Sequence, residues 1–262
     1  MINIHRRVLN ILTSAAFLTA GSFAQTNTIA NTSMASYGPI VAPDSIAAVW
    51  GTNLASQTVP ATSLPLPTSL GGVQVSVTDS KGMKLIASLF MVSPGQINYV
   101  VPATAAIGNA TVTVTSGANT LQGPLLISNV APGIFTANAD GKGVPAAQIL
   151  QITAGGQTTI QTPFMKGQST FVPSPISLSP STDSYFLVLY GSGIRRRSAN
   201  PAKATIGGVS VPVSYAGTQS QYPGVDQVNI GPLPQALVGM GQVDVIVYID
   251  GVPANTVQLS FQ

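Results

Sequence analysis

The sequence contains no cysteine, no glutamate and little charge of either sign. Its 262 residues include a single histidine, His5, and the seven acidic residues are all aspartate. The absence of cysteine excludes disulfide frameworks and thiolate metal sites. Only 6% of the residues are charged, whereas globular proteins carry about 25%, so Ser, Thr, Asn, Gln and Gly must supply most of the surface. Because 45% of the residues are hydrophobic, the composition is the opposite of that of a disordered chain.

The first 24 residues have the features of a secretory signal peptide. A basic stretch at residues 5–7 precedes a mostly apolar, uncharged run at residues 8–20, and Ser22 and Ala24 place small residues just before Gln25. This order predicts export with cleavage after residue 24, and an uncleaved anchor is the alternative. No second apolar run is long enough to span a membrane. The processed chain is therefore expected to be secreted, to the periplasm, cell surface or extracellular space, without membrane insertion.

Loss of the signal peptide would change the charge and the chemistry of the chain. Removal of His5, Arg6 and Arg7 takes the ten Lys and Arg residues to eight, against seven aspartates, a net charge of +1. That balance provides no basic field for nucleic acid or anionic lipid. The processed chain would have no His, Cys or Glu, which excludes Ser-His-Asp and Cys-His nucleophiles and the usual zinc sites. Glycosidase-like carboxylate pairs would have to come from aspartate alone, and we expect neither an enzyme nor a bound cofactor or metal.

Apolar and polar residues alternate with a period of two from residue 46 onward. β-Branched residues dominate these runs, and turn pairs such as Asp140-Gly141 and Asp250-Gly251 separate them. The 26 glycines and 20 prolines interrupt every stretch with a helical period. The pattern predicts an all-β fold of half-buried antiparallel strands. The clearest runs are residues 73–77, 111–115, 243–250 and 257–261.

Four sequence blocks occur twice, in the same order and 131 to 140 residues apart. The repeat predicts two copies of one β unit of about 80–90 residues, the size of a β-sandwich domain. The paired blocks are Val49-Trp50-Gly51-Thr52-Asn53-Leu54 with Leu189-Tyr190-Gly191-Ser192-Gly193-Ile194, Leu70-Gly71-Gly72-Val73 with Ile206-Gly207-Gly208-Val209, Pro94-Gly95-Gln96-Ile97-Asn98 with Pro223-Gly224 and Gln227-Val228-Asn229, and residues 111–117 with 245–251.

The repeated residues favour structural roles. We expect the rings of Trp50 and Tyr190 each to fill one end of the core of its own unit. The Gly-Gly pairs predict a β-bulge or a close approach of two backbones. Each Gln-x-Asn block places one apolar residue inward between two amides, which we expect to bond nearby backbone groups rather than a ligand.

A set of short motifs carries a family resemblance. They are residues 51–54, Gly71-Gly72, residues 93–98, residues 97–102, Ala131-Pro132-Gly133-Ile134-Phe135, residues 189–194, Tyr215-Ala216-Gly217 and residues 250–255. Together they resemble the IPT/TIG immunoglobulin-like domain and, more closely, the Solibacter-type C-terminal domain, an uncharacterised domain of secreted acidobacterial proteins. The resemblance runs from about residue 38 to residue 262. It implies a secreted protein with immunoglobulin-like sandwiches and brings no catalytic or binding residue with it.

After the signal peptide, these observations predict a lead and two domains. Residues 25–37, rich in Thr, Asn, Ser and Ala, are expected to form a flexible lead. Residues 38–129 form the first sandwich, and residues 130–262 form the second, whose repeat core is 184–262. Residues 130–178 contain too many apolar residues for an unstructured linker, and we expect them to lie as hairpins against the second domain. The predicted fold is two tandem immunoglobulin-like (IPT/TIG-like) β-sandwiches with short hairpins between them.

The one run of like charge, Arg195-Arg196-Arg197, is the candidate ligand contact. Its guanidinium groups are suited to an acidic polysaccharide or a phosphate, and the alternative is a solvated loop that keeps a nearly neutral protein soluble. Residues 138–141 contain one carboxylate, whereas a calcium loop needs about six to eight oxygen ligands, so we expect a hairpin turn there.

Two functions remain for an exported pair of sandwiches. The first is a non-enzymatic structural, adhesive or protein-interaction module of the cell exterior, whose partner would be an extracellular or cell-surface protein or polysaccharide. The alternative is a carbohydrate-binding module, which needs exposed aromatic platforms. With one tryptophan and seven tyrosines the supply is limited, and the candidates are Tyr37, Tyr99, Tyr215 and Tyr222.

Overall fold

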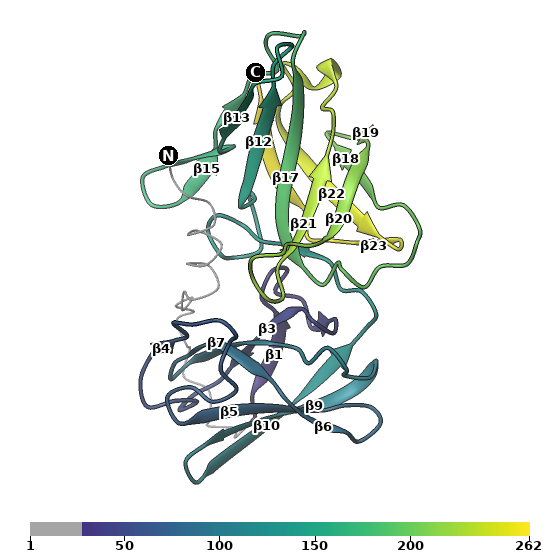
Figure 1. Ribbon diagram of the computed structural model, residues 1–262. Coiled ribbons are helices and arrows are strands. Elements are labelled where there is room, and N and C mark those ends of the chain that lie inside the picture. Colours follow the sequence, from purple (N-terminus) through teal and green to yellow (C-terminus); the bar gives the residue numbers. More distant parts are fainter. Residues whose placement is uncertain (1–27) are drawn as a thin grey trace.

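The computed structural model describes residues 28–262, which fold into two β-sandwiches, one above the other in Figure 1. The predicted signal peptide, residues 1–24, lies outside the described residues. Within them, every regular element is a strand except one short 3-10 turn, η1 (Gln235–Leu237). The prediction of an all-β fold with two immunoglobulin-like sandwiches is therefore confirmed. Residues 28–129 are called domain 1 below, and residues 130–262 domain 2.

Domain 1 consists of two five-stranded sheets. Sheet 1 has the order β1 (Ala30–Ser33), β3 (Ile46–Trp50), β8 (Gln96–Val100), β7 (Ser88–Val92) and β4 (Val59–Pro60). Sheet 2 has the order β2 (Ile40–Val41), β10 (Asn119–Ile127), β9 (Gly108–Ser116), β5 (Val73–Thr78) and β6 (Lys84–Ile86). Side chains alternate along each strand, so Tyr99 of sheet 1 meets Val75 and Val112 of sheet 2 in the core between them.

Domain 2 repeats this plan with more strands. Sheet 3 has the order β13 (Thr158–Gln161), β12 (Ala147–Ile152), β17 (Ser184–Ser192), β21 (Asp226–Ile230) and β20 (Val213–Thr218), with β11 (Gly133–Ile134) also on β17. Sheet 4 has the order β16 (Pro175–Ile176), β24 (Val257–Phe261), β22 (Gly241–Ile249), β18 (Lys203–Ile206) and β19 (Val209–Val211), with β23 (Val252–Pro253) on β22. Leu187 and Val228 of sheet 3 meet Val247 and Leu259 of sheet 4 in its core.

The segment between the repeats divides into two parts. β12 and β13 are strands of sheet 3, because Ala147 and Ile149 alternate into the core of domain 2. They form the expected hairpin on that domain, but as part of sheet 3 rather than laid against it. β14 (Phe164–Lys166) and β15 (Phe171–Pro173) do form a separate hairpin, in which the rings of Phe164 and Phe171 meet edge to face at 5.7 Å.

The predicted flexible lead, residues 25–37, is wrong for its described part. Residues 30–33 form β1, which pairs antiparallel with β3 at the edge of sheet 1. Backbone pairing and a few buried contacts hold this strand, so no hydrophobic period marks it in the sequence. Ile29 is buried in the core of domain 1, and Asn31 Nδ2 donates to the Pro124 carbonyl at 3.0 Å. Gly123 makes room for this approach, because a Cβ there would lie 2.2 Å from the Ile29 carbonyl oxygen.

The repeated glycine pairs have the same geometry in both domains. Gly71 and Gly72 have φ of +56° and +79°, and Gly207 and Gly208 have φ of +57° and +80°. Each pair makes the two central residues of a tight hairpin turn, since the flanking residues pair with each other. The predicted bulge at these glycines is therefore wrong: two successive residues with positive φ form a hairpin turn, and glycine adopts that geometry without strain.

The bulges occur on another strand, again at equivalent places. The register shifts between Leu89 and Met91, where β7 pairs with β8. It shifts in the same way between Val213 and Tyr215, where β20 pairs with β21. Sheets 1 and 3 therefore correspond strand by strand, with β3, β8 and β7 of domain 1 matching β17, β21 and β20 of domain 2.

Candidate functional site at the domain junction

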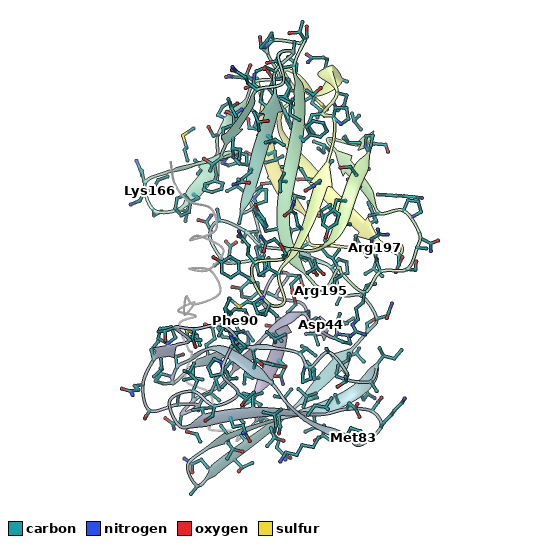
Figure 2. The ribbon with its side chains drawn as sticks, in the orientation of Figure 1. Asp44, Met83, Phe90, Lys166, Arg195 and Arg197 are labelled. Atoms are coloured by element: carbon teal, nitrogen blue, oxygen red, sulfur yellow. The ribbon has the colours of Figure 1, made fainter. Side chains whose placement is uncertain are left out.

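A third apolar core, here called the junction core, lies between the two domains. Domain 1 contributes the outer face of sheet 1, and Phe90 of β7 lies where the two domains meet in Figure 2. Its buried members are Met34, Ala35, Ile46, Ala48 and Phe90 of domain 1, and Phe135, Val144, Ala146, Phe164, Tyr190 and Val225 of domain 2. Because separating the domains would expose this apolar surface to water, the two sandwiches hold one relative orientation.

The repeated aromatic residues Trp50 and Tyr190 both pack on the junction core. The prediction that each ring fills an end of its own domain core is wrong. The preceding residue on each strand points into its own domain core, so alternation directs the next side chain to the opposite face. Trp50 Nε1 donates to Thr32 Oγ1 at 2.9 Å, and the Tyr190 hydroxyl donates to Gln148 Oε1 at 3.1 Å. Burial raises the pKa of Tyr190, so its hydroxyl keeps its proton and remains a donor.

The repeated amides form one hydrogen bond in both domains. Gln96 Nε2 donates to Asn98 Oδ1 at 2.8 Å, and Gln227 Nε2 donates to Asn229 Oδ1 at the same distance. In each block one amide bonds the other, which is a structural role rather than contact with a ligand. The surroundings differ, because Gln96 and Asn98 are buried while Gln227 and Asn229 are half-buried.

Polar contacts cross the junction beside its apolar core. The buried Ser192 hydroxyl accepts from Ile46 N and donates to the Gly224 carbonyl, both at 2.8 Å. Gly224 has a φ of +74°, and a Cβ there would lie 2.5 Å from Ile46 Cγ1. The Tyr37 hydroxyl of domain 1 donates to the Ala139 carbonyl of domain 2. These contacts require close approach of the two backbones, which fixes the domains more tightly than apolar burial alone.

Arg195 forms a largely buried ion pair with Asp226. Arg195 Nε lies 2.7 Å from Asp226 Oδ1, and the backbone N–H groups of Ile194 and Arg195 donate to Asp226 Oδ2 at 2.7 and 3.2 Å. Arg195 Nη2 also donates to the Val225 carbonyl at 2.7 Å. Burial raises the pKa of the Asp226 carboxyl, and the Arg195 guanidinium and the two N–H donors oppose this shift. The pair anchors the loop after β17 to the start of β21, beside the junction core.

Arg196 connects the two domains directly. Its Nη2 lies 3.0 Å from Asp44 Oδ2 and donates to the Ala103 carbonyl, and both partners belong to domain 1. In return, Asn129 Nδ2 of domain 1 donates to the Arg196 carbonyl at 2.9 Å. Figure 2 shows Asp44 at the level where the domains meet. An exposed ion pair of this kind contributes at most about 1 kcal/mol, so it orients the domains more than it stabilises them.

Arg197 is bound within domain 2. Its Nε donates to the Ala216 carbonyl at 2.8 Å, and its Nη1 donates to the carbonyls of Ser198 and Asn200. All three guanidinium groups of the run therefore have partners in the chain. No pattern in the sequence indicated the two carboxylates, which lie 31 and 152 residues from their arginines. A ligand contact by the run stays a prediction, while the structure gives it a role in fixing the junction.

The four candidate aromatic platforms have different surroundings. Tyr99 is buried in the core of domain 1, and burial raises the pKa of its hydroxyl. Tyr37 and Tyr222 are partly buried, and burial together with the Asp140 charge raises the pKa of Tyr37 to about 12. Tyr215 is 42% exposed, and it is the only exposed aromatic side chain in residues 28–262. The structure thus offers a single aromatic platform within this range.

The turn at residues 138–141 is held by its own side chains. Thr136 Oγ1 donates to Asp140 Oδ1 at 3.0 Å, and Asn138 Nδ2 donates to the Phe171 carbonyl at 2.9 Å. No group of three His, Cys, Asp or Glu side chains in residues 28–262 could hold a metal ion. A shallow pocket of about 270 Å³ lies near the C-terminus, where Ser177 and Gln235 line it, and its lining carries no charged side chain. Neither feature provides reactive chemistry.

In the part of the chain that is described, no helix has the length and apolar character to cross a membrane.

Comparison with family models and with curated proteins finds no match. Among solved structures, domains 5–6 of the S-layer protein SbsC match over 90% of this chain and 96% of that chain, with 15% identity and a TM-score of 0.27. The extracellular region of plexin A4 matches over 84% of this chain and 17% of that chain, with 10% identity and a TM-score of 0.25. SGBP-B from a xyloglucan utilization locus of Bacteroides uniformis matches over 88% of this chain and 47% of that chain, with 12% identity and a TM-score of 0.25. Likenesses at these TM-scores carry no information about function.

Proposed function

We propose that the chain is a secreted, non-enzymatic structural or adhesive module of the cell exterior, and that it belongs with the secreted family that its motifs resemble. The observation that carries this proposal is the junction core, which Phe90 of domain 1 and Tyr190 of domain 2 help to form. Domains joined only by a linker move independently by default. A pair that shares an apolar core holds its outer surfaces in fixed relation, which suits a spacer or a scaffold.

The chemistry of the described residues supports the non-enzymatic part of the proposal. Every aspartate of the chain accepts a hydrogen bond from another group of the same chain, so each carboxylate has a structural role. The donors are Arg196 to Asp44, Lys81 N to Asp79, Thr136 to Asp140, Gln151 to Asp183, Arg195 to Asp226, Gln258 to Asp244 and Ser198 to Asp250.

The first experiment tests the rigid pairing on which the proposal depends. Because the chain has no cysteine, Thr115→Cys and Ser210→Cys introduce one labelling site on an exposed position of each domain. Spin labels on these cysteines, diluted with unlabelled protein, report the distance between domains by electron–electron resonance. We expect one narrow distance distribution, which broadens when Phe90→Ala is added. A broad distribution in the protein that retains Phe90 contradicts the proposal.

The second experiment tests the location and the absence of turnover. A tagged full chain, expressed in its source organism, should be accessible to protease added outside the cells and should cross-link to neighbours on intact cells. Retention in the cytoplasm would overturn the proposal. So would measurable turnover of polysaccharide or peptide substrates by purified residues 25–262.

A carbohydrate-binding module is the second candidate, and the exposed ring of Tyr215 is the observation that favours it. A glycan array probed with residues 25–262 separates the two functions. Strong binding that free glycan competes away, and that Tyr215→Ala abolishes, would establish the second candidate.

For the arginine run, Arg196→Ala is the informative variant because this guanidinium is exposed. Unchanged affinity for acidic glycans in that variant would remove the run from consideration.

A further inference from the structure

The same sheet face is covered in domain 1 and, away from Tyr190, open in domain 2. The outer face of sheet 1 is buried at the junction, where Ile46, Ala48 and Asn98 all have no exposed surface. The equivalent face of sheet 3 carries Phe186 and Val188, which are only half-buried. β12, β17, β21 and β20 form the front layer of domain 2 in Figure 1. The duplicated unit therefore presents this face twice, but another domain covers only the copy in domain 1.

The correspondence between the faces rests on strand register. Tyr190 pairs with Gln227 as Trp50 pairs with Gln96, so two residues before each aromatic ring Val188 matches Ala48. Beyond the bulge, Tyr215 pairs with Asn229 in β21. The equivalent pair in domain 1 joins Met91 to Asn98. Met91 has no exposed surface, whereas Tyr215 is 42% exposed. Positions with the same place in the fold therefore differ in exposure as well as in side chain.

The open face of sheet 3 carries no charge and includes several large apolar side chains. Cross-strand pairs place Ile160 beside Leu150, Leu150 beside Phe186, and Tyr215 beside Asn229. Ile160 is 57% exposed. The six strands of sheet 3 contain one charged residue, Asp226, which is fully buried against Arg195. This patch, defined as Ile160, Leu150, Phe186, Val188, Asn229 and Tyr215, is called the open face.

We propose that the open face binds the open face of a second copy of this chain, around a two-fold axis. A face without charge meets an identical face without like-charge repulsion. The open face also continues an existing interface, because Val188 packs against the junction core on the same strand as Tyr190. The end of domain 2 that covers the equivalent face of domain 1 is already buried in the junction core. A second copy cannot use that end, and it presents its own open face instead.

Sedimentation of residues 25–262 tests this proposal by oligomeric state. We expect a monomer–dimer equilibrium whose Kd rises at least about tenfold in Tyr215→Lys and in Ile160→Lys, because each places charges face to face. Leu126→Lys is the matched control, since Leu126 lies on the outer face of sheet 2 and is 42% exposed, as Tyr215 is. A protein that is monomeric throughout, or a dimer that Leu126→Lys weakens as much as Tyr215→Lys, overturns the proposal.

A second measurement locates the contact with labels on exposed positions. A spin label on Ser214→Cys, which is exposed beside Tyr215, should show a short distance between chains, and a label on Leu126→Cys should show a long one or none. A dimer with the opposite order of distances contradicts the proposal. A monomer would leave the proposed function intact, because that function is tested by location and by the distance within one chain.

Discussion

Sheets 1 and 3 have the same strand register and bulge but opposite surroundings. At the bulge, domain 1 has Phe90 and domain 2 has Ser214. Phe90 is buried in the junction core, whereas Ser214 is exposed. The comparison teaches that the duplicated backbone does not determine which face becomes a core. The covering domain determines it, and the side chains at equivalent positions differ accordingly.

The largest effect should come from the bulge position itself. Phe90→Ala removes a ring that is 1% exposed and leaves a cavity in the junction core, so we expect a loss of about 3–5 kcal/mol in the free energy of unfolding. Ser214→Ala, at the equivalent exposed position, should change it by less than about 0.5 kcal/mol. Urea unfolding of both variants measures the difference. Equal losses would show that the two faces are not distinguished by burial.

The second comparison is between neighbouring arginines. Arg195→Ala leaves the Asp226 carboxylate buried without its cation and should cost about 3 kcal/mol at neutral pH, whereas Arg196→Ala should cost at most about 1 kcal/mol. Burial raises the pKa of Asp226, so the folded state holds the proton more tightly than the unfolded state does. Loss of Arg195 raises this pKa further, so the cost of the substitution should grow as the pH rises through the folded-state pKa of Asp226, which lies above the unfolded value of about 4.

Thermal unfolding of the two arginine variants between acid and neutral pH checks this prediction. A cost for Arg195→Ala that is the same at low and neutral pH would mean that the Asp226 charge is not what the arginine stabilises.

The smallest of the three expected losses of stability concerns two equivalent glycines, Gly224 and Gly95. Gly224→Ala places a Cβ 2.5 Å from Ile46 Cγ1 at a φ of +74°, and should cost about 1–3 kcal/mol while loosening the junction. At Gly95, its counterpart in domain 1, the nearest atom to a Cβ is the Gly51 carbonyl oxygen at 3.8 Å, so Gly95→Ala should cost less than about 0.5 kcal/mol. Melting temperatures of both variants test the pair. A cost at Gly95 equal to that at Gly224 would contradict the close approach at the junction.

Local patterns predicted the parts of the molecule that depend on nearby residues. Alternation assigned Val75 and Val247 to buried faces, and the spacing of the repeated blocks predicted two sandwiches. The failures share a different cause. β1 was missed because pairing with β3, rather than a hydrophobic period, holds it, and the Trp50 and Tyr190 rings were assigned to the wrong core because alternation does not say what covers the second face.

Local sequence patterns were enough to predict the clearest strands, their inward residues and the duplication, because a period of two acts over a few bonds. Tertiary packing brings Arg196 to Asp44 and Arg195 to Asp226, and it covers sheet 1 where sheet 3 is largely open. Ion pairing and burial depend on groups that the chain brings together across 31 to 152 residues, and no local pattern encodes such a meeting.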